Sequence, residues 1–277
     1  VMGGGATGEA LTRSPGLDAI SFTGSQATGA RVAAIAAERG VRVQLEMGGK
    51  NPLVVLDDAD LAVAVNCAVQ GAYYSTGQRC TASSRLIVTE GIHDRFVAAL
   101  VERLGQLKVD DALAPGTDIG PVVDARQLEK DLDYIRIAQE EGACLAFGGT
   151  RLERAKRGHY LAPTLFAETT AAMCINREEV FGPVASVIRA KDYDEALALA
   201  NDSPFGLCAS IVTTALKHAT DFKRNAEVGM VMVNLPTAGV DYHVPFGGRK
   251  GSSHGPREQG AFAREFYTTV KTAYVLA

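Results

Sequence analysis

The chain has 277 residues, of which 47% are hydrophobic and 22% are charged, and its formal net charge is −4. This composition is ordinary for a soluble globular protein, and the length allows one large domain or two smaller ones. Lys and Arg are not clustered in one segment, which argues against nucleic acid or an anionic membrane as the partner. No apolar run approaches the roughly 20 residues that span a bilayer, and no secretory signal pattern opens the chain.

The cysteines favour a reducing compartment. There are five of them, at 67, 80, 144, 174 and 208, with no CxxC pair. An odd, scattered set argues against a disulfide framework or a zinc site and favours a cytoplasmic protein. We interpret Cys67, Cys144 and Cys208 as core residues and leave Cys174 as an outside alternative to Cys80 for a reactive thiol.

Short β-rich runs alternate with helical patterns along the chain. The first helix is the best marked, because Ser25 is a suitable N-cap and Gly40 a suitable stop. In chain order, the patterns predict strand 19–22, helix 25–39, strands 41–46 and 52–57, helix 60–74, strand 84–90, helices 93–107 and 124–141, strands 144–149 and 184–190, helix 194–201, strand 208–214, helix 215–226 and strand 229–234.

This alternation predicts an α/β fold with a mostly parallel sheet. Residues 236–260 are rich in Gly and Pro and lack periodicity, so we expect an ordered loop there. Residues 267–276 alternate in polarity and predict a terminal strand.

Two glycine-containing segments are candidates for phosphate binding. GGGATG (3–8) has GxGxxG spacing, but only two residues precede it, so a glycine-rich turn is the preferred interpretation. In SFTGSQATG (21–29), Gly24 makes the turn between a strand and a helix that opens at Ser25. Backbone N–H groups and a hydroxyl at a helix N-terminus suit a pyrophosphate, although a capped helix without a ligand is an equally good interpretation.

QLEMGGKNP (44–52) places Glu46 at the end of a strand, beside Gly48 and Gly49. Clefts of α/β proteins lie at the carboxyl ends of strands, and a buried carboxylate there suits a general base. The alternative is a structural ion pair, for example with Lys50.

YYSTGQRCTASSR (73–85) surrounds Cys80 with small and polar residues. A thiolate is a strong nucleophile when a nearby cation or helix end lowers its pKa, and Arg79 is adjacent. The alternative is a structural cysteine. No histidine is close in sequence and we expect most of the five at the surface or in loops, so a pair of Cys80 with Glu46 is more economical than a Cys–His pair.

Two later segments complete the candidates. In REEVFGPV (177–184), Glu179 can accept hydrogen bonds from a ribose diol and Phe181 can lie against a flat ring. VPFGGRKGSSHG (244–255) carries Phe246, a candidate substrate contact. The alternative for 177–184 is a solvated acidic turn, and the alternative for 244–255 is a structural loop.

The order and spacing of these motifs are more specific than any one of them. FTGSxxxG (22–29), LEMGGKNP (45–52), GQRC (77–80), EVFGPV (179–184) and PFGG (245–248) follow one another as in the aldehyde dehydrogenase superfamily, which the chain resembles over essentially its whole length. The 34 residues from Glu46 to Cys80 are similar to that family's spacing between base and nucleophile.

The resemblance implies NAD(P)+-dependent oxidation of an aldehyde to an acid. Cys80 would form a thioester that Glu46 hydrolyses as general base, and a base at this position favours release of the acid over transfer to coenzyme A. The resemblance also implies cofactor contacts at Gly24, Ser25, Gly48, Glu179 (nicotinamide ribose) and Phe181 (nicotinamide ring), and substrate contacts at Arg79 and Phe246. No metal is expected.

Family members are longer than this chain, so the resemblance implies a C-terminal portion. Residues 1–47 would end a Rossmann-type NAD(P)-binding domain, 48–248 would form an α/β catalytic domain, and 249–277 would be a tail with an oligomerisation strand. An asparagine donor to the oxyanion would precede Val1, and loss of one such donor costs roughly 100- to 1,000-fold in rate. We therefore expect weak activity or none from 277 residues alone.

Several points stay open at this level. NAD and NADP are not distinguished, because the segment that contacts the adenine ribose would precede Val1. A homo-oligomer, dimer or tetramer, is expected because an unpaired terminal strand invites pairing. The alternatives to an enzyme are a non-catalytic fragment and a nucleotide-binding module in which Cys80 is structural.

The segments 73–85 and 234–260 are most similar to the branch of the family that oxidises 2,5-dioxopentanoate (α-ketoglutarate semialdehyde). Arg79, Arg249 and Lys250 offer cations that an acidic semialdehyde requires. We therefore expect acidic semialdehydes to be preferred over uncharged aldehydes of equal length.

Overall fold

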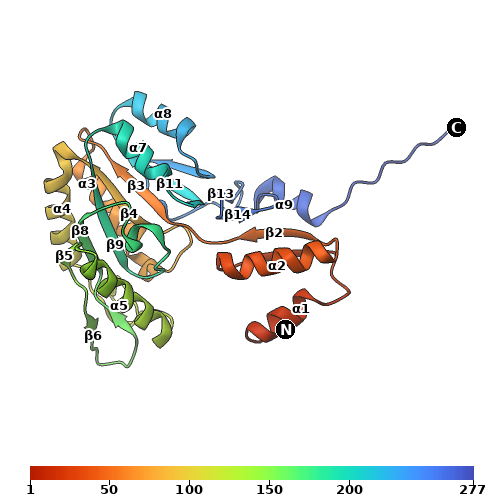
Figure 1. Ribbon diagram of the computed structural model, residues 1–277, viewed down its shortest axis with the longest axis horizontal. Coiled ribbons are helices and arrows are strands. Elements are labelled where there is room, and N and C mark those ends of the chain that lie inside the picture. Colours follow the sequence, from red (N-terminus) through yellow and green to blue (C-terminus); the bar gives the residue numbers. More distant parts are fainter.

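The two main β-sheets differ in size and are joined by the short turn between residues 46 and 51 (Figure 1). The structure, a computed structural model, describes residues 1–277. The smaller sheet has three strands in the order β1-β2-β14, and the larger has seven in the order β12-β11-β3-β4-β9-β8-β5. The chain passes from the first sheet into the second, and a short segment near its C-terminal end, residues 253–254, returns to the first.

The smaller sheet and its two helices form the first body. β1 (Ala19–Thr23) and β2 (Arg42–Glu46) are parallel and are connected through α2 (Gln26–Glu38), while α1 (Gly5–Thr12) packs on α2. Val32, Leu45 and Met47 form its small core. The Ser25 side chain accepts a hydrogen bond from the Thr28 N–H, which confirms the predicted N-cap.

The larger sheet is parallel except at one edge. Its strands are β3 (Asn51–Val55), β4 (Ser83–Thr89), β5 (Cys144–Phe147), β8 (Thr164–Thr169), β9 (Val184–Ala190), β11 (Cys208–Val212) and β12 (Met230–Val233). All neighbouring pairs run parallel except β5 with β8. The predicted α/β fold with a mostly parallel sheet is therefore confirmed.

Helices cover both faces of this sheet. They are α3 (Leu61–Ala72), α4 (Glu90–Gly105), α5 (Ala125–Glu140), α6 (Cys174–Arg177), α7 (Tyr193–Asn201) and α8 (Leu216–Asn225). Leu53 and Val55 pack with α3 and α4, whereas Val54 between them packs with α7 and α8. This alternation is the period-2 pattern of a strand buried on both faces.

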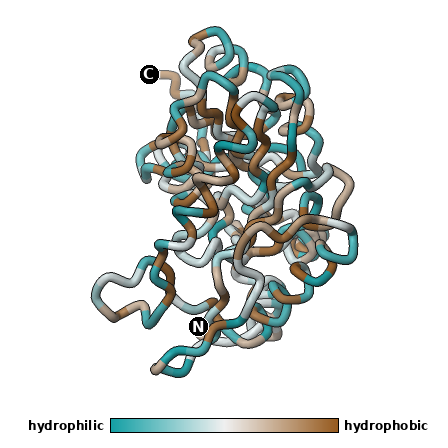
Figure 2. The backbone as a smooth tube through the Cα atoms, turned by 90° about the vertical axis from the view of Figure 1, so that its left-hand side faces the viewer, coloured by the Kyte–Doolittle hydropathy of each residue, from teal (hydrophilic) through white to brown (hydrophobic).

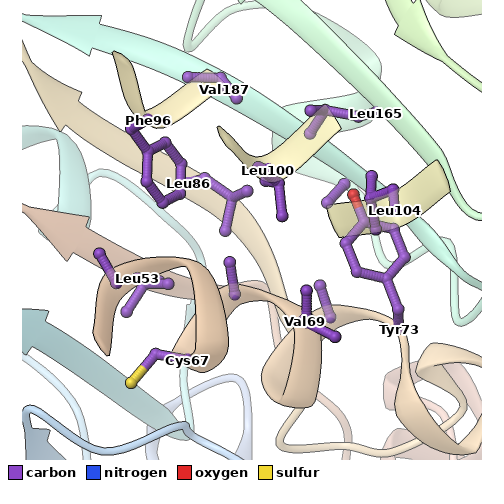
Figure 3. Packing of buried hydrophobic residues seen from close by; sticks show 14 of the residues in the cluster. Leu53, Cys67, Val69, Tyr73, Leu86, Phe96, Leu100, Leu104, Leu165 and Val187 are labelled. Carbon is purple, nitrogen blue, oxygen red and sulfur yellow. The ribbon is translucent and has the colours of Figure 1, made fainter. Parts of the chain in front are cut away.

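Figure 3 shows the first of these two layers, in which Phe96, Leu100 and Leu104 of α4 and Val69 and Tyr73 from the α3 segment meet the strands. Figure 2 shows the same partition along the backbone, with hydrophobic segments in the interior and hydrophilic segments in the outer loops. None of the helices has the length and apolar character needed to cross a membrane.

A segment near the C-terminal end of the chain links the two sheets. β13 (Arg249–Lys250) pairs with β10 (Phe205–Gly206), and β14 (Ser253–His254) then pairs with β2. The helix α9 (Gly260–Tyr267) follows. The segment 236–260, predicted as an ordered loop, therefore contains two short strands that hold the bodies together.

Several predicted elements need correction. GGGATG is not a turn, because α1 begins at Gly5. The predicted strand 267–276 is absent. Tyr267 ends α9, and the residues after Thr268 extend away from the body without a strand partner (Figure 1). An alternating pattern makes a strand only where a neighbouring strand completes its hydrogen bonds. The elements β6 (Arg151–Leu152), β7 (Tyr160–Leu161), β8 and α6 had no prediction.

One prediction of burial is also wrong. Cys144 is exposed, because it lies on the edge strand β5, whereas Cys67 and Cys208 are buried as expected. Among the five histidines, most of which were expected at the surface or in loops, His93 is buried within α4, and its Nδ1 lies 2.9 Å from Asp94 Oδ1.

Candidate active site

The candidate residues converge where two bodies meet: the small sheet with its two helices, and the large sheet with the helices that cover it. Glu46 ends β2 of the small sheet, Cys80 lies in the loop before β4 of the large sheet, and Glu179 lies before β9. The carboxyl end of one sheet thus faces the amino ends of central strands of the other. The turn at Gly48 and Gly49 connects them, and it places residues 130 positions apart in hydrogen-bonding contact.

A short 3-10 turn, η1 (Tyr74–Gly77), leads into the Cys80 loop. Gly77 has a φ of +64°, and a Cβ there would lie 2.2 Å from the Gly182 carbonyl oxygen, so only glycine fits. The Asn51 side chain donates to the carbonyls of Cys80 (2.8 Å) and Ala82 (2.9 Å). These contacts fix the loop that carries the thiol.

The pKa of the Cys80 thiol is raised, first by burial and then by the carboxylates of Glu179 and Glu46. The Arg79 guanidinium donates to the carbonyls of Gln70 and Gly71 in the last turn of α3, although its charge still attracts that of the Cys80 thiolate. The net shift of the Cys80 pKa is upward, because burial and the two carboxylates outweigh the adjacent cation. Residues adjacent in sequence point in different directions here.

Glu46 is buried, with 3% of its surface exposed, and its two oxygens have different partners. Gln44 Nε2 donates to Oε1 at 3.3 Å and Ser253 Oγ donates to Oε2 at 2.7 Å. Burial raises the pKa of Glu46 to about 7, partly opposed by the Ser253 hydrogen bond, and Glu258 raises it further while Arg257 lowers it. A carboxyl group that titrates near neutral pH suits proton transfer at that pH.

The alternative interpretation of Glu46, an ion pair with Lys50, does not hold. Lys50 is fully buried and its Nζ has no hydrogen-bond partner. Burial, with Arg85 nearby, lowers the pKa of Lys50 to about 7, and the carboxylate that opposes this shift most is that of Glu179.

Glu179 is held by the turn after β2. Its Oε1 accepts a hydrogen bond from the Gly49 N–H at 2.9 Å. Gly48 has a φ of +72°, and a Cβ at this position would lie 2.6 Å from both carboxylate oxygens of Glu179. Burial raises the pKa of Glu179 although the Gly49 N–H lowers it. The alternative of a solvated acidic turn therefore does not fit this partly buried side chain.

Phe181 and Phe246 lie at different parts of the junction. Phe181, with a φ of +66°, lines a cavity of about 10 Å³ together with Gly49, Arg79 and Glu179. Phe246 is buried, and its backbone exchanges two hydrogen bonds with Glu258. Phe246 is therefore part of the link made by the returning chain.

The predicted phosphate segment lies beside a larger cavity. The Gly24 N–H donates to the Glu46 carbonyl at 3.0 Å, so it is not free for a ligand, and the Ser25 hydroxyl is engaged with Thr28. A cavity of about 340 Å³ between α1 and α2 is lined by Phe22, Thr28, Arg31, Val32 and Ile35, among others. One wall of this cavity is α1, a helix that the sequence patterns did not predict.

Three residues of the site were not among the sequence candidates. Gln44 and Ser253 bind Glu46, and Asn51 holds the Cys80 loop. Gln44 had a detectable signal, since residues two apart on a strand share a face. Ser253 had none, because it comes from a strand of two residues, 207 positions away in sequence.

Similarity to known proteins identifies the class of protein. The model of the aldehyde dehydrogenase family matches residues 1–273, and the chain belongs to that family.

Among curated relatives, the chain is 43% identical over 274 residues to an alpha-ketoglutaric semialdehyde dehydrogenase of Bacillus subtilis. It is 46% identical over 276 residues to an alpha-ketoglutarate semialdehyde dehydrogenase of Haloferax volcanii. Each match covers 98% of this chain and 56% of the relative, so the chain spans about half the length of the curated relatives it matches.

Solved structures agree. A betaine aldehyde dehydrogenase from Staphylococcus aureus, in complex with NAD+, is 35% identical with a TM-score of 0.91, over 94% of this chain and 52% of that one. An aldehyde dehydrogenase from Bacillus cereus is 36% identical with a TM-score of 0.93, over 97% and 54%.

Proposed function

We propose that this chain carries the nucleophile and the general base of an NAD(P)+-dependent aldehyde dehydrogenase. The observation that supports this most directly is the junction of the two bodies, where Cys80 and Glu46 come together and the pKa of Glu46 is about 7. A thiol and a carboxyl group that can accept a proton near neutral pH are the two groups that a thioester route requires.

In this proposal the Cys80 thiolate adds to the aldehyde carbon and forms a thiohemiacetal. NAD(P)+, when bound, supplies the acceptor for the hydride that leaves this carbon. The product on Cys80 is then a thioester. Glu46 takes a proton from water, the hydroxide attacks the thioester, and the carboxylic acid leaves with return of the thiolate. Because both carboxylates raise the pKa of Cys80, a cationic ring beside the thiol would favour its ionised form.

The cofactor contacts remain those that the resemblance implies: Gly24 and Ser25 against the pyrophosphate, Glu179 at the nicotinamide ribose, Phe181 at the ring, and Gly48 in the turn that supports Glu179. The Gly24 contact would not involve its N–H, which donates to the Glu46 carbonyl. The cavity between α1 and α2 is large enough for a nucleoside. It begins beside the N-terminus of α2, so an adenosine there would place its phosphates near Ser25. The neighbour in complex with NAD+ supports NAD.

An acidic semialdehyde such as 2,5-dioxopentanoate is the proposed substrate. The support comes from the names of the two curated relatives. Of the cations expected to bind it, Arg79 donates to a backbone carbonyl and Lys250 lies 2.7 Å from Glu227, whereas Arg249 is exposed on β13. Arg79 remains a proposed substrate contact. Phe246 remains a proposed contact.

We also propose the division into a cofactor-binding part (1–47), a catalytic part (48–248) and a tail (249–277), within a cytoplasmic homo-oligomer. The boundary at residue 47 is supported by the change from the small sheet to the large sheet at that point. Five free cysteines are compatible with a reducing compartment. The exposed apolar residues of the tail support an assembly.

The test is formation of reduced cofactor from NAD+ or NADP+ with 2,5-dioxopentanoate, using the natural polypeptide and its Cys80→Ser variant. We expect Ser to lower the rate at least about 1,000-fold, because a hydroxyl is a far weaker nucleophile at neutral pH, with cofactor affinity nearly unchanged. Retained oxidation in Cys80→Ser would reassign the nucleophile. Equal turnover of an uncharged aldehyde of the same length would remove the substrate proposal.

A further inference from the structure

We propose that Gln44 and Ser253 are positioning residues that hold the Glu46 carboxylate in its charged form between two donated hydrogen bonds, so that the returning end of the chain tunes the base. This inference rests on the proposed role of Glu46. It concerns residues that the sequence patterns and the comparisons leave without a function.

The two donors reach opposite oxygens from different elements. Gln44 lies two residues before Glu46 on β2, on the same face of the strand, and is buried. Ser253 belongs to β14 and is the register partner of Glu46 in the antiparallel pair with β2. The donor–acceptor distances are 3.3 Å to Oε1 and 2.7 Å to Oε2.

Each donor is itself fixed in the donating orientation. The Ser21 hydroxyl donates to Gln44 Oε1 at 2.8 Å, which turns the amide nitrogen toward Glu46. The Gly248 N–H donates to Ser253 Oγ at 2.6 Å, so the proton of that hydroxyl is directed to Glu46 Oε2. Both groups donate to Glu46, and both therefore stabilise its carboxylate over the protonated form.

The two donated hydrogen bonds oppose the effect of the surroundings on the pKa of Glu46. Burial favours the neutral form of Glu46, and so does the charge of Glu258, whereas Arg257 favours the carboxylate. Glu46 and the thiol of Cys80 also interact across the junction. With the pKa of Glu46 already about 7, removing either donor increases the protonated fraction of the carboxyl group at neutral pH, and a protonated carboxyl group cannot accept a proton from water.

The test follows the titration of Glu46 itself by NMR, with carbon-13 at the glutamate side-chain carboxyl groups. Glu46→Gln assigns the signal by its disappearance. The informative variants are Ser253→Ala and Gln44→Leu, which remove one donor each from different elements, and Ser253→Thr, which retains a hydroxyl. Ser252→Ala is the matched control, because its hydroxyl accepts from the Gly206 N–H and is not a partner of Glu46.

We expect the midpoint of Glu46 to rise by about one pH unit in Ser253→Ala and in Gln44→Leu, as for loss of a hydrogen bond to a charged group. Ser252→Ala should leave the midpoint in place, and Ser253→Thr should return it toward the wild-type value. An unchanged midpoint in both informative variants, or an equal shift in the control, overturns the proposal. This readout needs no turnover, so absence of aldehyde oxidation by the natural polypeptide alongside a shifted midpoint would overturn the proposed function and leave only the hydrogen-bond control of the Glu46 charge standing.

Discussion

Gly48 shows how a residue without a side chain makes room for the Glu179 carboxylate. Its φ of +72° is a conformation that side chains rarely adopt, and the space for a Cβ is occupied by the Glu179 carboxylate at 2.6 Å. We expect Gly48→Ala to displace Glu179, to break its hydrogen bond to the Gly49 N–H, and to lower the free energy of unfolding by about 1–3 kcal/mol. Denaturant titration measures the change in the free energy of unfolding, and NAD+ affinity reports the displacement of Glu179.

Gly40→Ala is the control for Gly48. Gly40 has nearly the same φ, +64°, but no heavy atom lies within 4 Å of its missing Cβ. It should therefore show the backbone cost, about 1 kcal/mol, without a change in NAD+ affinity. Equal losses of affinity in both variants would show that strain, not contact with Glu179, explains the effect.

Among elements, α5 carries a buried acid whose titration affects stability. Asp131 is fully buried; Oδ1 accepts from Gln127 Nε2 at 2.8 Å, and Oδ2 has no partner. Burial raises the pKa of Asp131 from 3.8 to about 7, although the Gln127 hydrogen bond lowers it. Since the folded-state pKa is the higher one, this group stabilises the fold fully below about pH 3.8 and loses that contribution as the pH rises through 7.

Asp131→Asn should therefore reduce the loss of stability between pH 4 and pH 7, by about 2–4 kcal/mol. Urea unfolding at several pH values measures this difference. Glu46 has a raised pKa in the same window and contributes a slope of the same sign, which the variant retains. Glu129→Gln, on the exposed side of the same helix, should leave the profile unchanged. A profile of Asp131→Asn that is parallel to the wild type would contradict the prediction.

For the whole molecule, the extended end of the chain should matter for assembly and not for folding. Residues 269–277 are exposed and make no hydrogen bond, whereas the Thr268 carbonyl accepts from Arg42 at 2.9 Å (Figure 1). We expect a chain that ends at Thr268 to change the free energy of unfolding of the monomer by less than about 0.5 kcal/mol.

Light scattering tests whether the extended end of the chain matters for assembly. If the proposed homo-oligomer forms through this apolar segment, its removal should lower the molar mass in solution. Unfolding measured at a dilution where the chain is monomeric separates the two effects. A large loss of stability under that condition would mean that the segment docks on its own body.

Sequence patterns were sufficient for the central elements and for the main candidates. The strands β3, β4, β9 and β11 were predictable because β-branched and apolar residues buried on both faces of a sheet leave long hydrophobic runs. The helix α2 was predictable because Ser25 caps it locally. Cys80, Glu46 and Glu179 were singled out because reactive residue types stood beside glycines in motifs of a known order.

The features that only the tertiary structure determines depend on contacts between distant segments. The terminal strand was predicted from alternation alone and is absent, since hydrogen bonding to a neighbour, not the pattern, makes a strand. The direction of Arg79, the raised pKa of Cys80 and the donors Gln44 and Ser253 around Glu46 follow from packing across the junction. Local sequence determines which segments become helices and strands here, whereas desolvation and hydrogen bonding between segments up to 207 residues apart determine the charge states on which the proposed chemistry depends.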